Sequence, residues 1–201
     1  MNSHISELDI YDFDKTIVPF DSGSLFCVYA MLHYPKAIRN LPRMFFAAVK
    51  YLKHNDLTAM KSDIFCFIRD IPVEKAAKKF WDKYEKYIYP WAKKENRERY
   101  SVMISASPEF LIREVAGRIE IDDYFCTQHD ADGKIIGINC HDREKVRLFK
   151  EKYDGTQVVS VYSDSIENDK YIFSLAKNCY HTVKGKKIPF RYEDKYKNDK
   201  I

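Results

Sequence analysis

ISELDIYDFDKT, at residues 5–16, is the stretch of sequence that decides the fold. Its first part, residues 5–12, has the apolar spacing of a strand and runs into a turn rich in aspartate. Two carboxylates, Asp12 and Asp14, stand where this strand is expected to end. Carboxylates so close repel each other unless a cation lies between them, and Mg²⁺ is a hard cation that prefers oxygen ligands. Taken alone, the pattern also fits an aspartate-rich turn or a helix cap.

The sequence beyond residue 99 alternates between strand-like and helix-like segments. Residues 125–127 and 135–138 flank Asp132-Gly133, which predicts a β-hairpin. The tail from Lys184 is charged and is expected to be partly disordered. Alternation predicts an α/β fold, with a Rossmann-like parallel-sheet core and helices on both faces. The other strands are expected at 100–105, 156–162 and 179–183, and the helices at 108–118, 142–153 and 165–176.

Residues 20–97 show no strand-like alternation and are expected to be helical throughout. The predicted domains are therefore a catalytic core at 1–19 and 98–201 and an inserted all-α cap domain at 20–97. In open α/β sheets the ligand site lies beyond the carboxyl ends of the strands, so the insert should cover that site as a lid. Helices are expected at 25–34, 35–54 and 59–68 and after Pro72, with Ser22 or Ser24 capping the first and Asp56 or Thr58 the third.

Composition indicates a globular protein, because 45% of the 201 residues are hydrophobic, which is enough to form a packed core. The five cysteines are widely spaced without a CxxC pair, which argues against a zinc site or a disulfide framework and favours a reducing compartment. No secretory signal is visible at the N-terminus, and no apolar run reaches the roughly 20 residues of a membrane span. We expect a cytoplasmic protein, either a monomer or a homodimer.

The net charge of +4 is concentrated in one segment, residues 20–95, which holds 14 Lys/Arg against 8 Asp/Glu. Such a segment attracts anionic substrates or anionic membrane surfaces, although solvated helix faces are the commoner explanation. Within it, residues 41–52 are apolar, aromatic and edged with cations, as in helices that rest on lipid. The core of a helical bundle is the favoured interpretation. A membrane surface is thus not the expected partner, and dispersed basic residues without a recognition motif argue against nucleic acid.

Two more predicted strands end in polar residues, Ser105-Ala106-Ser107 and Ser163-Asp164-Ser165. Asp164, followed by Asp169, supplies the further acidic groups that a metal site needs. The hydroxyl of Ser105 and backbone N–H groups at a helix start suit phosphate oxygens. Lys145 would balance the charge that develops in phosphoryl transfer. Each residue also fits a plain structural role, as a helix cap or, for Lys145, as a surface lysine.

In their order along the chain, these residues resemble the haloacid dehalogenase superfamily. Residues 12–16 resemble its first motif, Ser105 the second, Lys145 the third, and residues 163–165 with Asp169 the fourth. The insert is similar to that of the phosphoserine phosphatase-like branch, which also includes a bacterial phosphatidylglycerophosphatase.

Three positions depart from the family pattern. Lys15 stands where many members have Gly, and Ser163 replaces the common Gly before Asp164. Asp169 follows Asp164 by five residues, where four is more usual. The longer spacing leaves Asn168 as a rival for the role assigned to Asp169.

The resemblance implies a Mg²⁺-dependent phosphatase that hydrolyses a small phosphorylated metabolite through an aspartyl-phosphate on Asp12. Asp14 is then the general acid and base, and Lys145 a catalytic cation. Asp21 contacts substrate in this scheme, although a helix cap fits it equally well. The implied phosphate-binding residues are Thr16, Ser105 and Ala106, and the implied metal ligands are Asp12, Asp14 through its carbonyl, Asp164 and Asp169.

Other functions also fit the sequence. A lipid-precursor phosphate is an alternative substrate, and a phosphotransferase would use the same intermediate with an acceptor alcohol instead of water. Dehalogenases and phosphonatases of the superfamily lack an Asp at the position of Asp14. A non-enzymatic binding module is disfavoured because Asp12 and Asp14 are both present.

Overall fold

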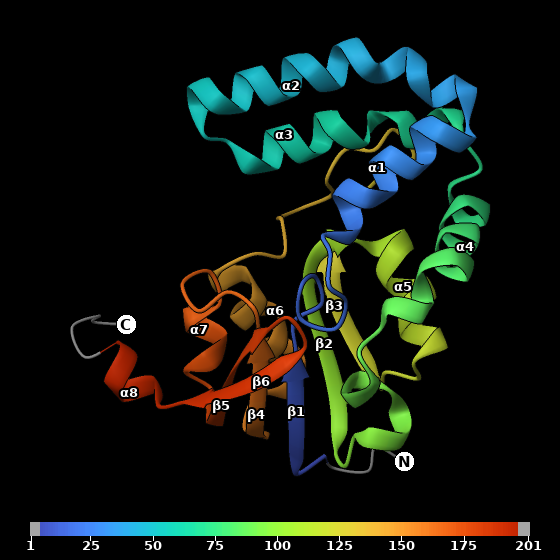
Figure 1. Ribbon diagram of the computed structural model, residues 1–201. Coiled ribbons are helices and arrows are strands. Elements are labelled where there is room, and N and C mark those ends of the chain that lie inside the picture. The colour runs from blue at the N-terminus through green and yellow to red at the C-terminus, as the bar shows by residue number, and fades with distance from the viewer. Residues whose placement is uncertain (1–4, 197–201) are drawn as a thin grey trace.

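The computed structural model describes residues 5–196, and it contains a six-stranded sheet in the order β3-β2-β1-β4-β5-β6 (Figure 1). The first five strands are parallel and β6 is antiparallel to β5. The predicted parallel α/β core is confirmed. The strands are β1 (Glu7–Tyr11), β2 (Tyr100–Pro108), β3 (Asp123–Thr127), β4 (Gln157–Ser163), β5 (Ala176–Val183) and β6 (Lys186–Phe190).

Helices cover both faces of this sheet, as predicted. Leu8 and Ile10 of β1 pack in one buried cluster with residues of α6 (Arg143–Tyr153) and α7 (Lys170–Phe173). Tyr11 belongs to a second cluster, which includes the buried residues of α5 (Glu109–Arg118). The period of two along a strand sends alternate side chains to opposite faces, so both sides of β1 are buried.

Only helices occur between β1 and β2, over residues 22–96. In Figure 1 the helices α1 to α3 stand beyond the carboxyl ends of the parallel strands, and α4 returns beside α5. We call residues 22–96 the helical insert; the domain limits at residues 20 and 97 stay a prediction. Its elements are α1 (Ser22–His33), η1 (Pro35–Asn40), α2 (Leu41–His54), α3 (Leu57–Ile64), η2 (Phe65–Asp70), α4 (Val73–Tyr84), η3 (Glu85–Tyr87), η4 (Pro90–Ala92) and η5 (Lys94–Asn96).

The predicted hairpin around Asp132-Gly133 is present only as a short antiparallel turn, without a second strand. β3 pairs in parallel with β2, and the segment beyond the turn forms only an isolated bridge between His129 and Ile135. The turn itself exists, since the amide of Gly133 donates to Asp130 at 3.0 Å. Gly137 has a φ of +74°, which interrupts the extended backbone that a second strand would need.

Two expectations near the C-terminus are also corrected. The helix predicted at 165–176 shrinks to α7, because Ser163 accepts the amide of Ser165 and side-chain hydrogen bonds of this kind compete with helix formation. The tail from Lys184 is ordered as β6 and α8 (Tyr192–Lys195), and its last residues, 197–201, lie outside the described chain.

The state of the cysteines and the length of the helices bear on two expectations from the sequence. The five cysteines are free thiols, and four of them are buried. Over residues 5–196, no helix combines the length and the apolar character required to cross a membrane. The cytoplasmic location stays a prediction.

Gly133 lets the loop after β3 lie directly against the helical insert. Its φ is +81°, and an added Cβ would lie 2.1 Å from the carbonyl oxygen of Phe65. Gly137 has a similar φ, but a Cβ there would meet nothing within 4 Å. We expect Gly133→Ala to lower the free energy of unfolding by roughly 1–3 kcal/mol more than Gly137→Ala. Chemical denaturation of both variants measures the difference, and equal losses would contradict this close approach.

Candidate active site

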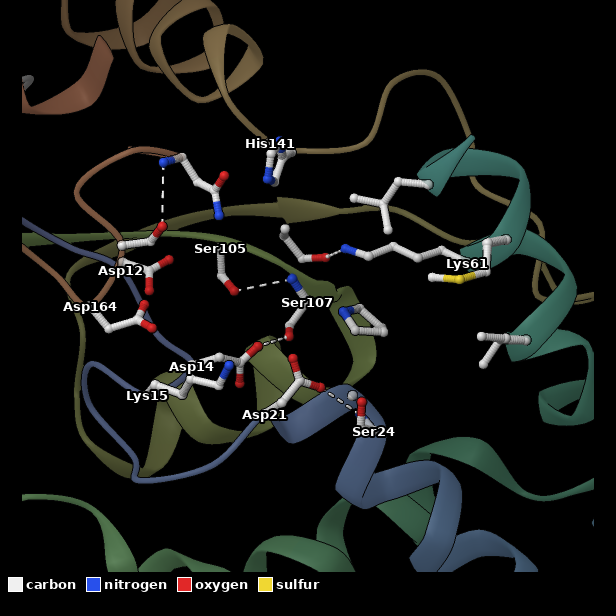
Figure 2. A pocket seen from close by; sticks show the side chains of 18 of the residues that line it. Asp12, Asp14, Lys15, Asp21, Ser24, Lys61, Ser105, Ser107, His141 and Asp164 are labelled. Atoms are coloured by element: carbon white, nitrogen blue, oxygen red, sulfur yellow. Dashed lines mark hydrogen bonds between the residues drawn. The ribbon is translucent and has the colours of Figure 1, made fainter. Parts of the chain in front are cut away.

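A cavity of about 490 Å³ lies between the strand ends and the helical insert (Figure 2). The insert contributes an apolar wall that includes Leu57, Met60 and Ile64. Of the residues predicted for the site, all but Thr16 line this cavity: Asp12, Asp14, Asp21, Ser105, Ala106, Lys145, Asp164 and Asp169.

Asp12 directly follows β1 and is held from three sides. Its amide donates to the carbonyl of Tyr162 on β4 at 2.9 Å. One carboxylate oxygen accepts a hydrogen bond from Lys145 Nζ at 2.8 Å and the other from Thr16 Oγ1 at 2.9 Å. Burial raises the pKa of Asp12 to about 7, and the carboxylates of Asp169 and Asp164 add to this rise while Lys145 opposes it. Asp12 is thus a buried, oriented carboxylate in a cluster with excess negative charge.

Lys145 is buried, so the alternative of a surface lysine is wrong. It reaches from α6 and lies 2.8 Å from one oxygen each of Asp12 and Asp169. Burial disfavours its ammonium, but the two carboxylates outweigh burial and raise the pKa of Lys145 well above its ordinary value. Asp169 is itself buried, and its second oxygen accepts a hydrogen bond from Ser163. Ser163, which replaces the usual Gly, therefore helps to hold Asp169 against Lys145.

Asp14 points away from Asp12 and Asp164, toward the helical insert (Figure 2). Its carboxylate accepts one hydrogen bond from the amide of Ser22 at 2.7 Å and another from the hydroxyl of Ser107. Burial raises the pKa of Asp14 to about 6, Asp21 adds to the rise, and the two serines oppose it. Asp14 is therefore separated from Asp12 and can exchange a proton near neutral pH.

Ser105 and Ala106 lie at the end of β2, beside these carboxylates. Ser105 is buried, and its hydroxyl oxygen accepts a hydrogen bond from the amide of Ser107 at 3.1 Å. Ser107 and Ser22 were not predicted as partners of Asp14. For Ser107 a signal was present, since residues 105 and 107 lie on the same face of an extended strand.

Thr16 does not line the cavity. It is fully buried, and its hydroxyl oxygen accepts the amide of Asp164 at 2.9 Å while donating to Asp12. Thr16 therefore ties the ends of β1 and β4 together, and its position does not favour the predicted contact with phosphate. Lys15 has a φ of +57°, a conformation that glycine adopts more easily than residues with a side chain.

Asp21 is the N-cap of α1, where its carboxylate accepts the amide of Ser24 at 2.7 Å. The helix-cap interpretation is thus confirmed, and the predicted substrate contact stays open because Asp21 also lines the cavity.

Lys61 and His141 line the cavity without having been predicted. Lys61 reaches from α3 and donates to the carbonyl of Ala106 at 2.8 Å and to Asn139 at 3.3 Å. Burial lowers the pKa of Lys61 and that of His141. In the sequence Lys61 looks like any other lysine of a solvated helix face, so nothing marked it as a link between the insert and the sheet.

The carboxylates of Asp12 and Asp164 both line the cavity and interact electrostatically (Figure 2). Within residues 5–196, no group of three or more His, Cys, Asp or Glu side chains is arranged to hold a metal ion. Asp14 is hydrogen-bonded to two serines, and Asp169 is bonded to Lys145 and Ser163. Burial raises the pKa of Asp164, and repulsion from Asp169 contributes. The two remaining carboxylates fit Mg²⁺, which binds one or two carboxylates together with waters and substrate phosphate.

Comparison with known proteins gives one family match and several similar folds. Residues 10–171 match the model of a family described as haloacid dehalogenase-like hydrolase. No curated protein matches the sequence.

Three solved structures resemble the fold. One is a protein of unknown function from Bordetella pertussis Tohama I, with 13% identity, a TM-score of 0.62, and coverage of 88% of this chain and 81% of that chain. A phosphoserine phosphatase in apo form has 16% identity, a TM-score of 0.54 and coverage of 86% and 84%. A phospho-aspartyl intermediate analogue of phosphoserine phosphatase has 17% identity, a TM-score of 0.53 and coverage of 88% and 86%. At these identities the likeness establishes a shared fold.

Proposed function

Because the chain belongs to the haloacid dehalogenase-like hydrolase family, we propose that this hydrolase is a Mg²⁺-dependent phosphatase with Asp12 as its nucleophile. One observation carries the proposal. Lys145 holds one oxygen of the buried Asp12, while Asp14 is held apart by Ser22 and Ser107 on the side of the cavity nearer the insert. A nucleophile and a separate acid–base group are the two functions that hydrolysis of a phosphomonoester requires.

The reaction has two chemical steps. A carboxylate oxygen of Asp12 attacks phosphorus, the bond from phosphorus to the substrate oxygen breaks, and Asp14 gives its proton to the leaving alkoxide. Asp14 then takes a proton from water, whose oxygen attacks the aspartyl-phosphate and releases inorganic phosphate with regeneration of Asp12. The raised pKa of Asp14, about 6, supports both roles because the group exchanges its proton readily near neutral pH.

The charge on the phosphoryl oxygens is balanced from several directions. Lys145 supplies a permanent cation, and Ser105 with the backbone amide of Ala106 supplies hydrogen-bond donors at the end of β2. Mg²⁺, when bound, adds the divalent positive charge that lowers the energy of the transferring phosphoryl group.

Asp12, Asp164 and the carbonyl of Asp14 would hold Mg²⁺. We assign the supporting position to Asn168, which lines the cavity, and not to Asp169. One carboxylate oxygen of Asp169 already forms an ion pair with Lys145, and the other accepts a hydrogen bond from Ser163. Asp169 then acts as a positioning residue for Lys145.

The substrate in this proposal is a small phosphorylated metabolite. A cavity of about 490 Å³ admits a phosphate group and a compact organic group. Its wall on the insert side offers the carboxylate of Asp21 beside apolar side chains, which suits a substrate with an amine or hydroxyl group. The similar structures described as phosphoserine phosphatase support phosphorylated amino acids as the first compounds to examine.

Release of inorganic phosphate tests the proposal directly. Purified protein with Mg²⁺ should hydrolyse members of a panel of phosphorylated amino acids, sugars, nucleotides and head-group esters, and a chelator should abolish the activity. Adding acceptor alcohols separates hydrolysis from phosphotransfer, since a phosphotransferase would release less inorganic phosphate. If no member of the panel is hydrolysed at any Mg²⁺ concentration, the proposed function is wrong.

Asp14→Asn tests the acid–base role. We expect kcat to fall by roughly 100-fold or more, the usual scale for a lost general acid–base, while the Mg²⁺ concentration for half-maximal activity stays nearly constant. The amide oxygen of Asn can accept the hydrogen bond of the Ser22 amide, and its NH2 group can donate to the hydroxyl oxygen of Ser107, so the fold should be unaffected. Hydrolysis of a phosphomonoester at the wild-type rate would exclude Asp14 from the chemistry.

A further inference from the structure

The outward face of α2 is apolar and exposed. Its side chains are 46–85% accessible although they lie on a helix of an otherwise well-packed protein. Spacings of four, four and three residues place Leu41, Phe45, Val49 and Leu52 on one side of the helix, with Phe46 next to them. We call these five residues the α2 face: Leu41, Phe45, Phe46, Val49 and Leu52.

The prediction that this stripe forms the core of a helical bundle is wrong. Ala47 is the only buried residue of α2. Aromatic side chains of other segments, among them Phe26, Phe67, Phe80 and Trp81, fill the core of the insert instead. In Figure 1, α2 lies on the side of the insert farthest from the sheet and packs on α3. The α2 face therefore has no partner among residues 5–196.

Cations lie along one edge of the α2 face, without acidic neighbours in the sequence. Residues 33–54 include five Lys or Arg and no Asp or Glu. Arg43 pairs with Asp63 of α3 at 2.8 Å, whereas Lys50 and Lys53 are exposed and form no ion pair within the described residues. An apolar face edged by free cations is complementary to a surface that offers hydrocarbon and negative charge together.

We propose that the α2 face docks the protein onto an anionic lipid surface. The helix α2 has 14 residues and is therefore about 21 Å long. Because the hydrocarbon core of a bilayer is roughly 30 Å thick, α2 is too short to cross it and would lie along the membrane surface. A second copy of the chain fits less well, because a two-fold contact between identical faces would bring the same cations together. Docking is separate from hydrolysis and goes beyond the proposed function.

Flotation with lipid vesicles tests the docking. The full chain is mixed with vesicles of phosphatidylcholine alone or of equimolar phosphatidylcholine and phosphatidylglycerol, at low and at high salt. We expect binding to the anionic vesicles only, weakened by salt because screening reduces the attraction of Lys50 and Lys53. Phe45→Ser/Leu52→Ser and Lys50→Glu/Lys53→Glu should each lower the bound fraction by about tenfold or more.

Matched controls keep the test specific. Lys75→Glu/Lys78→Glu reverses two exposed cations at the same spacing on α4, and Ile188→Ser removes an exposed apolar side chain of β6. Both should bind like the wild type, and thermal melting of every variant verifies folding. Absence of vesicle binding, binding unaffected by the α2 variants, or a dimer that these variants dissociate would each overturn the proposal, whether or not the protein is a phosphatase.

Discussion

Asp12→Asn is expected to lower kcat by roughly 10⁴-fold or more, the scale on which enzymes lose turnover when a covalent nucleophile is removed. The amide is nearly the same size as the carboxylate, and its one oxygen can still accept a hydrogen bond from Lys145, so the geometry around β1 should persist. What disappears is the negative oxygen that attacks phosphorus. Single-turnover assays with a soluble aryl phosphate, followed by acid quenching, measure both the rate and the phosphoenzyme.

Asp21→Asn is the matched control for this variant. Asp21 lines the same cavity, and Asn is an equally good N-cap for α1, so the helix should remain stable. We expect its kcat to stay within about tenfold of the wild type, with any larger effect appearing in KM because the residue would act on substrate binding. Rates for Asp12→Asn as high as those for Asp21→Asn would remove Asp12 from the mechanism.

Lys145→Met is expected to cost about 3–5 kcal/mol of folding free energy and to abolish activity. The substitution keeps the length of the side chain but leaves Asp12 and Asp169 facing each other without the buried cation, and uncompensated buried charges carry a cost of this size. The raised pKa of Lys145 means that its ammonium stabilises the folded state at every pH below the ordinary lysine value. The loss in free energy of unfolding relative to the wild type should therefore persist throughout the neutral pH range. Chemical denaturation at several pH values would measure it.

A second substitution separates stability from catalysis. In Lys145→Met/Asp169→Asn the repulsion is reduced, so we expect part of the lost stability to return while activity stays absent. Lys61→Met is the control for a buried lysine in the same cavity. Because Lys61 is bonded to a carbonyl and an amide and not to carboxylates, its loss should be less destabilising than that of Lys145. Equal losses of stability in the two lysine variants would contradict the ion-pair account.

Most of the core was predictable because its signals are local. The apolar spacing of residues 5–12 and the following Asp12 and Asp14 predicted β1 and the end of the sheet where the cavity lies. The absence of alternation after Ser22 predicted that the insert is helical. The hairpin is shorter than predicted, because β3 pairs with β2, more than fifteen residues earlier in the chain.

The sequence predicted several of the residues that line the cavity, but it did not predict which of them form hydrogen bonds or ion pairs with one another. The sequence pattern gave the supporting metal position to Asp169 with Asn168 as a rival, and the bonds of Asp169 to Lys145 and Ser163 are what favour our proposal of Asn168. Likewise, Ser22 and Ser107 became partners of Asp14 only through the contact between the insert and β2. Hydrogen-bond partners far apart in sequence depend on how elements pack, and no spacing rule encodes them.

The sequence by itself determined the class of fold, the helical insert and the acidic groups at the strand ends, because periodicity and turn chemistry act within a few residues. Tertiary structure decided which side chains hold Asp14 and Lys145, and that the apolar stripe of α2 faces outward. The helical spacing of apolar residues shows only that one face of a helix is more apolar than the opposite face. Whether the apolar face meets protein depends on which distant segments fill the core, and here Phe26, Phe80 and Trp81 fill it.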